Sequence, residues 1–319
     1  MRVGSDFSGV GAFEQALKRL KIDYSTVFAC DIDKYARQTY LENNGEPGYF
    51  PNDVYDRDIP AEPLTIYMSS PPCQSFSLAG SRKGEQDDRG VLFYNSHEFI
   101  KVNKPRYFIF ENVKGLLSDD NGKTFQRWID YLATSVNGQP VIFPHEESVM
   151  YHVYHKVLNS KDFGVPQNRE RIFIIGIRDD KDNYFRFPKE EYLTKKLKDV
   201  LENEVDDKYY LSESAINGIK NSTYESKQNI IQNKDYADTI LSRDYKDPKC
   251  IKTENSQAIE MKQSKIRRLT PRECFRLQDF PDSFTWTCSD TQAYRQAGNS
   301  ITVGVLEKLL NKLINVNNF

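Results

Sequence analysis

Cysteine is scarce in this chain, and its spacing excludes two common structural devices. There are five cysteines, an odd number, and no two of them form a C-x-x-C pair. They are widely spaced, at Cys30, Cys73, Cys250, Cys274 and Cys288. This pattern argues against a disulfide framework and against a zinc site, and it favours a reducing compartment. We therefore expect no metal.

Long apolar runs and a net charge are also missing. No stretch approaches the ~18 apolar residues of a membrane span. The first residues, MRVGSDFSGVG, have no long apolar core of the signal-peptide kind. We therefore expect a soluble protein of the cytoplasm that binds no membrane. The formal net charge is −2, so any contact with nucleic acid would need a local basic surface.

One cysteine directly follows a strand-like run. Leu64–Met68 is short and apolar, which predicts a buried strand. Pro71 and Pro72 end it, because proline fixes φ and lacks a backbone donor. Cys73 therefore lies just past the carboxyl end of a strand, the edge where open α/β sheets bind ligands. A lone cysteine is more often an inert thiol, so the role of Cys73 depends on the rest of the chain.

The chain opens with a predicted strand, a glycine turn and a helix. The strand is Arg2–Asp6, the turn is FSGVG, and the helix spans Ala12–Leu20 with apolar residues on one face. Backbone can approach a ligand closely at such a turn, although an ordinary βα turn has the same pattern.

Two carboxylates follow at predicted strand ends. Ser25–Cys30 is a second strand that ends in Asp31, about 20 residues past the turn, where a carboxylate can accept hydrogen bonds from ribose hydroxyls. Asp33 is placed to cap a helix that begins at Lys34. Asp53 is expected at the end of a third strand, facing an adenine edge.

A third carboxylate and two arginines follow further along. Arg106–Phe110 is wholly apolar after its first residues and runs into Glu111, a costly position for a carboxylate without a function. We expect Glu111 on the same rim as Cys73. Further on, strand alternation sends Arg169 and Arg171 to one side, where they can bind a carbonyl oxygen or phosphates. A surface ladder with Glu170 is the alternative.

Four other segments complete the pattern. Gly80–Gly90 is polar and is expected to be a mobile lid with Arg82 and Lys83 towards phosphates, or else a surface loop. Gly122–Val136 reads as a helix. Thr270, Pro271 and Glu273 form a capping box, and a basic patch surrounds this helix start, comprising Arg267, Arg268, Arg272 and Arg276. Asn299 and Ser300 precede a closing helix, Ile301–Ile314.

Together these segments resemble the C5-cytosine DNA methyltransferase family, in the family's order and over nearly the whole chain. The matching motifs are DFSGVG, SSPPCQSFS, FENV, QNRERIFIIGIR, RRLTPRECFRLQDFPD and QAGNSITVGVL. The resemblance implies an α/β fold with a Rossmann-like, doubly wound, mostly parallel sheet and a smaller, irregular β-rich domain. Residues 1–178 and 266–319 would form the catalytic and S-adenosylmethionine-binding domain, and 179–265 the target-recognition domain.

The resemblance also implies roles for individual residues. Cys73 would be the nucleophile that adds to cytosine C6 while Glu111 holds the N3 edge, and Arg169 and Arg171 would position the base and the cysteine loop. The cofactor would be bound by Phe7, Gly9, Gly11, Asp31, Ile32, Asp53, Pro71, Leu92, Asn299 and Ser300. DNA would be contacted by Gln74, Ser77, Arg82, Lys83, Arg89, Arg267, Arg268 and Arg272.

The implied partner is double-stranded DNA, with the target base flipped out of the helix. We expect a monomer from a prokaryotic cell or phage, associated with the nucleoid, with S-adenosylhomocysteine as product and a possible cognate restriction endonuclease. A tRNA cytosine-5 methyltransferase on the same scaffold is the nearest alternative. Those relatives carry a Cys-Phe-Thr block in the recognition region, where this chain has only Cys250. A catalytically silent DNA-binding member would be expected to lose Cys73, Glu111 or the glycine turn.

Overall fold

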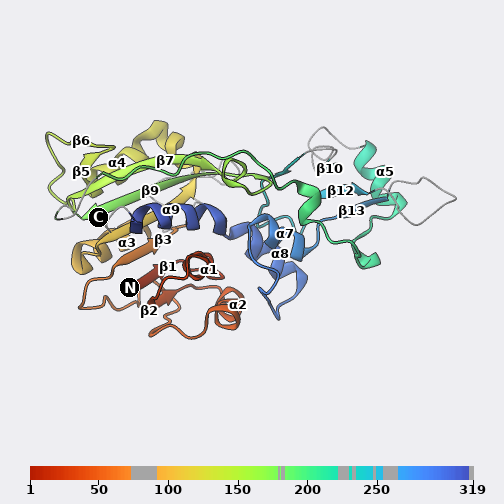
Figure 1. Ribbon diagram of the computed structural model, residues 1–319, viewed down its shortest axis with the longest axis horizontal. Helices are drawn as coiled ribbons and strands as arrows, with labels where there is room; N and C mark the ends of the chain where they lie inside the picture. The colour runs from red at the N-terminus through yellow and green to blue at the C-terminus, as the bar shows by residue number, and fades with distance from the viewer. Residues whose placement is uncertain are drawn as a thin grey trace. The chain divides into compact units, whose positions relative to one another are not determined.

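The computed structural model divides into two compact units. It describes residues 1–72, 92–178, 180, 184–221, 230–231, 235–246, 249–253 and 265–315 (Figure 1). The first unit comprises Met1–Asn159, Glu170–Lys189 and Val305–Phe319, and the second comprises Ser160–Arg169 and Glu190–Gly304. Most of the expected recognition domain, 179–265, falls within the second unit, and its function stays a prediction.

The first unit is built on one large sheet. Its strands are β1 Arg2–Asp6, β2 Ser25–Cys30, β3 Ile66–Ser69, β4 Tyr107–Val113, β5 Ala133–Val136, β6 Gln139–Pro140, β7 Tyr151–Asn159 and β9 Glu170–Arg178. They are ordered β2-β1-β3-β4-β9-β7-β5-β6. The first four run parallel, and β9 is antiparallel to both β4 and β7. The expected α/β class with a mostly parallel sheet is confirmed.

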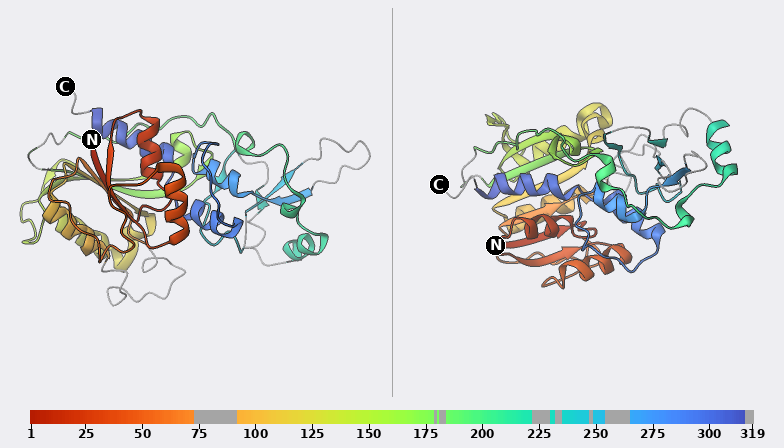
Figure 2. Two further views of the ribbon diagram at one scale, coloured as in Figure 1. Left: turned by 90° about the horizontal axis from the view of Figure 1, so that it is seen from below. Right: turned by 45° about the vertical axis from the view of Figure 1, so that its right-hand side comes forward.

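Helices cover both faces of this sheet. They are α1 Ala12–Arg19, α2 Lys34–Asn44, α3 Leu92–Asn103, α4 Lys123–Leu132 and α9 Val303–Asn315. Figure 2 shows α1, α2 and α9 on one face and α3 and α4 on the other. Beneath α3 and α4 the core is aromatic: Phe93 stacks on Trp128 with ring centroids 4.3 Å apart, and Phe110 meets both rings edge-on. As expected, the Asp33 carboxylate caps α2 by accepting from Tyr35 N at 2.8 Å.

Two expectations about local structure are wrong. The helix predicted over Gly122–Val136 ends at Leu132, and Ala133–Val136 forms β5, because alternating burial along this segment supplies sheet contacts that outweigh a short helical extension. Asp53 does not end a strand. The segment before it contains Pro47 and Pro51, which lack backbone donors, and it contacts β2 only through isolated bonds such as Gly48 N to Thr26 O at 2.9 Å.

The second unit contains only short strands among its described residues. These are β8 Gln167–Asn168, β10 Ile230–Ile231, β11 Ala237–Asp238, β12 Cys250–Thr253 and β13 Lys265–Arg268. Its helices are α5 Glu213–Asn221, α7 Pro271–Leu277 and α8 Asp290–Asn299. The predicted capping box is present, since Glu273 N donates to Thr270 Oγ1 and Thr270 N donates to Glu273 Oε2. In the described parts of both units, no helix has the length and apolar character that crossing a bilayer requires.

Candidate active site

The glycine turn after β1 adopts a backbone that few residues tolerate. Phe7, Gly9 and Gly11 have φ of 56°, 55° and 88°. A Cβ added to Gly11 would lie 2.1 Å from Asn44 Nδ2, so this position requires glycine. A Cβ added to Gly9 would meet no atom of the described residues within 4 Å. As far as the described part of the chain goes, the expected ligand-facing turn therefore has room for a group beside Gly9.

Asp31 is bound to this turn. Its Oδ2 accepts from Gly9 N at 2.7 Å, and its Oδ1 accepts from Asp33 N at 2.8 Å. Burial raises the pKa of the Asp31 carboxyl above its usual range, and these two N–H groups oppose the rise. The next side chain, Ile32, is 78% exposed. An apolar side chain left exposed beside a half-buried carboxylate is a suitable platform for a flat ring.

Asp53 is positioned by an arginine that the sequence analysis did not single out. Arg37, in α2, donates to the carbonyl oxygens of Pro51 at 2.7 Å and Phe50 at 2.8 Å. Its guanidinium also lies 3.8 Å from the centroid of the Phe50 ring. Arg37 therefore holds the irregular segment that leads into Asp53. Its position on a half-buried helix face carried no sequence signal.

A second overlooked group lies at the carboxyl end of β1. Asp6 is 1% exposed, and both its oxygens accept from Arg57 Nε, at 2.8 and 3.1 Å. Tyr67 Oη donates to Asp6 Oδ2 at 2.6 Å. Burial raises the pKa of Asp6, and Arg57 and Tyr67 act against it. This network anchors the residue immediately before the glycine turn.

The end of β3 leads towards the predicted nucleophile. Cys73, Gln74, Ser77, Arg82, Lys83 and Arg89 lie outside the described residues, as does the expected lid. Pro71 is described, and its carbonyl oxygen accepts from Asn112 Nδ2 at 3.2 Å. Asn112 is 4% exposed and was missed as a functional residue. The sequence feature that could have identified Asn112 is its position directly after Glu111. Leu92 begins α3 and packs against the aromatic core.

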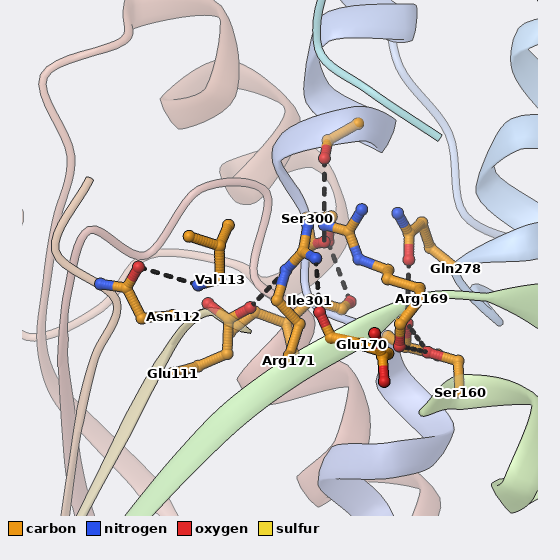
Figure 3. Close-up of polar contacts among 12 residues, drawn as sticks. Glu111, Asn112, Val113, Ser160, Arg169, Glu170, Arg171, Gln278, Ser300 and Ile301 are labelled. Atoms are coloured by element: carbon orange, nitrogen blue, oxygen red, sulfur yellow. Dashed lines mark hydrogen bonds and ion pairs between the residues drawn. The ribbon is translucent and has the colours of Figure 1, made fainter. Parts of the chain in front are cut away.

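Glu111 and Arg171 form an ion pair across β4 and β9. Arg171 Nε lies 3.1 Å from Glu111 Oε1, and the two side chains are 16% and 10% exposed (Figure 3). β4 continues through Val113, so Glu111 lies within the strand and not just beyond it. In the register of the two strands, Arg171 is opposite Val113, two residues from Glu111. Glu170 does not join this pair and bonds Lys114 Nζ at 3.0 Å.

Arg169 has different partners from Arg171. Its guanidinium donates to the carbonyl oxygens of Ile240 at 2.9 Å and Gly298 at 3.1 Å. It also donates to the carbonyl oxygen of Ser300 at 2.8 Å (Figure 3). It is 2% exposed. The expectation of two arginines on one side assumed a continuous strand. Because β9 begins at Glu170, the alternation does not extend to Arg169, and the two guanidiniums have no partner in common in the bonds described.

The predicted basic patch is only partly available to a ligand. Arg267 is 2% exposed, and its two terminal nitrogens bind the Glu273 carboxylate at 2.7 and 2.8 Å, so it is not the phosphate-facing side chain that we expected. Arg272 donates to Phe284 O and lies over the Trp286 ring, and Arg276 is bound to Asp282. Arg268 is exposed.

The last two predicted cofactor residues lie at the end of α8, in the second unit. Asn299 is exposed, and Ser300 is 9% exposed with its carbonyl oxygen bound to Arg169. Among all the residues that the structure describes, no group of three or more His, Cys, Asp or Glu side chains is arranged to hold a metal ion.

Comparison with known proteins identifies the family. The family model for C-5 cytosine-specific DNA methylase matches residues 1–315. The chain belongs to this family. This DNA methylase is 36% identical to the type II methyltransferase M.SsoII of Shigella sonnei, over 97% of this chain and 78% of that protein. It is also 36% identical to the type II methyltransferase M.NlaX of Neisseria lactamica, over 96% and 94%.

Solved structures share the fold of this DNA methylase. A Dnmt2 methyltransferase from S. pombe superposes with a TM-score of 0.72 at 20% identity, covering 100% of both chains. The methyltransferase EhMeth of Entamoeba histolytica superposes with a TM-score of 0.75 at 18% identity, covering 100% of this chain and 99% of that one. The expected methyltransferase fold is thereby confirmed.

Proposed function

We propose that this DNA methylase transfers a methyl group from S-adenosylmethionine to C5 of a cytosine in a short duplex DNA sequence, releasing S-adenosylhomocysteine. The observation that most supports this activity is the family match over residues 1–315. The ion pair between Glu111 and Arg171 supports the chemistry, because it holds a carboxyl group, which must take up a proton before it can act as an acid, and a fixed cation at one place on the sheet. A flipped cytosine presents its N3 edge and its O2 to such a pair.

The residues after β1 and β2 fit the cofactor. When bound, the cofactor supplies an electrophilic methyl group. The open space beside Gly9 admits it, Asp31 is held to accept from its ribose, and Ile32 is exposed for its adenine. The buried hydroxyl groups of Ser8 and Ser70 have no hydrogen-bond partner in the described part of the chain, so polar atoms of a ligand have donors there. Phe7, Gly11, Asp53, Pro71 and Leu92 complete this part of the proposed site in the first unit. For Asn299 and Ser300, which belong to the second unit, a cofactor role is proposed from the sequence motif.

Cytosine C5 is a poor nucleophile, and the proposed reaction first activates it. The Cys73 thiolate adds to C6 as Glu111 protonates N3, which moves electron density to C5. C5 takes the methyl group, a base removes the C5 proton, and the thiolate leaves as the ring double bond returns and N3 gives its proton back to the Glu111 carboxylate. Arg171 holds O2 by charge-assisted hydrogen bonds. Asn112, through the Pro71 carbonyl, positions the backbone that leads to Cys73.

We further propose a restriction-modification setting. The related proteins M.SsoII and M.NlaX are called type II methyltransferases, which supports a cognate endonuclease acting on the same sequence. We place the protein in the cytoplasm of a prokaryotic cell, or of a cell infected by a phage that encodes it. We propose that it acts as a monomer on double-stranded DNA.

Methylation-sensitive sequencing of plasmid DNA from cells expressing the protein tests the activity. We expect 5-methylcytosine at one short sequence with the intact protein and none with Cys73→Ala. Duplexes carrying 5-fluorocytosine at the target should trap a covalent complex, since fluorine cannot be removed as a proton is. Unmodified plasmid from both strains contradicts the DNA assignment, and methylation found only in tRNA of the same cells would replace it.

A further inference from the structure

The segment Thr239–Lys246 of the second unit is held by buried side chains from a distant part of the sequence. Ile240 N donates to Gln167 Oε1 at 2.8 Å, and Ile240 O accepts from Arg169 Nη1 at 2.9 Å. Gln167 and Arg169 are 0% and 2% exposed. Thr239 Oγ1 donates to Asn168 O at 2.7 Å. The entrance to this segment therefore has one defined backbone conformation.

The same segment then closes into a tight turn. The buried Asp244 carboxylate accepts from Leu241 N at 2.9 Å, and Asp244 N donates to Leu241 O at 3.0 Å. The backbone of Gly298 packs directly on it, since a Cβ added there would lie 2.2 Å from the carbonyl carbon of Leu241 and 2.3 Å from Ser242 N. The turn is fixed by contacts that leave little room for rearrangement.

Arg243 lies on this turn, and its guanidinium is not paired with any other described residue. It is exposed, and its guanidinium makes no hydrogen bond or ion pair with any other described residue. This differs from the arginines around α7, where Arg267 and Arg276 are bound to carboxylates. A guanidinium that is exposed, unengaged and mounted on a rigid turn is suited to recognise an external acceptor.

Cations outnumber carboxylates on the described segments that include Arg243 and the strands β12 and β13 of the same unit. In segments 239–246, 249–253 and 265–268, the only carboxylate is Asp244, which is 4% exposed and faces the turn's own backbone. Exposed cations lie on the same segments, at Lys246, Lys252 and Arg268. On a chain with a net charge of −2, these exposed cations are an excess of positive charge within one segment group, which is what contact with DNA phosphates requires.

We propose that the turn Leu241–Lys246 is a preformed DNA-reading element and that Arg243 recognises a guanine of the target sequence. The inference rests on the proposed function and names the residue that sets its specificity. An arginine fork donates to both O6 and N7 of guanine in the major groove, a pairing that a point charge such as lysine reproduces poorly. The neighbouring cations bind phosphates, and the prior ordering of the turn lowers the entropy lost on binding.

The test compares methylation rates on a panel of duplexes that contain the recognised sequence and each single base-pair change of it. The variants are Arg243→Ala, Arg243→Lys, which keeps the charge and removes the fork, and Arg186→Ala, which removes an exposed arginine in the first unit. Thermal melting of each variant checks the fold. The panel is repeated at several salt concentrations.

We expect both Arg243 variants to lose the preference for guanine at one position, by roughly 5- to 150-fold, while preferences elsewhere and in Arg186→Ala stay as in the wild type. A uniform fall on all duplexes, with a smaller salt dependence in Arg243→Ala only, would make Arg243 a phosphate contact and overturn the inference. Unchanged preferences would overturn it as well. A wild-type protein that methylates no duplex would overturn the proposed function, and the inference with it.

Discussion

Asn112 Nδ2 donates to the carbonyl oxygen of Pro71 across 3.2 Å, two residues before the predicted nucleophile. Asn112 lies on β4 and is 4% exposed, and Pro71 lies two residues beyond the end of β3, the parallel strand next to β4. Pro71 and Pro72 have no N–H groups and follow the end of β3, and here the Pro71 carbonyl accepts from a side chain. Asn112 thus links the strand that carries Glu111 to the backbone that carries Cys73.

Replacing Asn112 by Asp keeps its size but replaces the donor by an acceptor that repels the Pro71 carbonyl. We expect the single-turnover methylation rate to fall by about 100-fold, the effect typical of a misplaced reacting group, while DNA affinity stays near wild type. Rapid-quench methylation and gel-shift titration measure the two quantities. A rate within a few-fold of wild type would remove the positioning role.

Glu111→Gln keeps the shape of the side chain and removes the acid. Because the amide cannot protonate N3, we expect the methylation rate to fall by 10²- to 10⁴-fold on the proposed chemistry. Trapping on duplexes with 5-fluorocytosine should slow in parallel, since both processes need the C6 addition. Slow methylation together with normal trapping would instead move the role of Glu111 to a later step.

Arg37→Met should weaken cofactor binding without touching the cofactor. The variant loses two hydrogen bonds to the Phe50 and Pro51 carbonyls, so the segment leading to Asp53 loosens. We expect the Kd for S-adenosylhomocysteine, measured by titration calorimetry, to rise by about 10-fold, the cost of one to two hydrogen bonds. Gln38→Met, an exposed change on the next residue of α2, is the matched control. Equal affinities in both variants would contradict a positioning role for Arg37.

The Arg267–Glu273 pair should contribute strongly to the free energy of unfolding, because it is shielded from water and both terminal guanidinium nitrogens bind the carboxylate. Its side chains are 2% and 0% exposed, and Glu273 also accepts from Thr270 N and Glu202 N. Glu273→Gln leaves a buried guanidinium uncompensated, which costs about 3–5 kcal/mol of the free energy of unfolding. Asp282→Asn breaks the more exposed pair with Arg276 and should cost less than about 1 kcal/mol. Urea unfolding of the two variants gives the comparison, and similar losses would argue against the buried pair.

Glu14 should make stability fall as pH rises. This carboxyl, 1% exposed in the first turn of α1, has its pKa raised by burial from 4.5 to about 7, against the opposing effects of Tyr40, Ser5 and Lys18. The folded protein therefore binds the proton more tightly than the unfolded chain, and the free energy of unfolding decreases between about pH 4.5 and pH 7.

The contribution of Glu14 to this slope is at most about 3 kcal/mol, from 1.36 kcal/mol per pKa unit. Glu14→Gln removes the titrating group, so its unfolding free energy should vary less between pH 5 and pH 8 than that of the wild type. Chemical denaturation at a series of pH values measures both curves. A Glu14→Gln curve parallel to wild type would assign the slope to another group, such as Asp6, whose pKa burial also raises.

Local rules were sufficient wherever neighbouring residues decide the structure. β1, β2, the Asp33 cap and the Thr270 capping box are all as predicted, because each depends on residues within about one turn or strand. The motifs also identified Asp31 and Glu111 as carboxylates at the sheet, since buried apolar strands run directly into them. The family followed from the order of these motifs along the chain.

Tertiary structure alone decided which partner each charged group has. The sequence grouped Arg267 with Arg268 in one basic patch, yet only packing shows that Arg267 is buried against Glu273. Arg169 and Arg171 are two residues apart, yet Arg169 binds carbonyl groups that include Ser300 O, 131 residues away, while Arg171 binds Glu111 across the sheet. Such pairings depend on strand order and on where each strand begins, and a spacing of two residues does not carry that information. What sequence determined here was the chemistry available to the chain. Long-range packing decided which charged groups pair with each other. A buried charged side chain is stable only beside a partner, and the fold is what brings that partner to it.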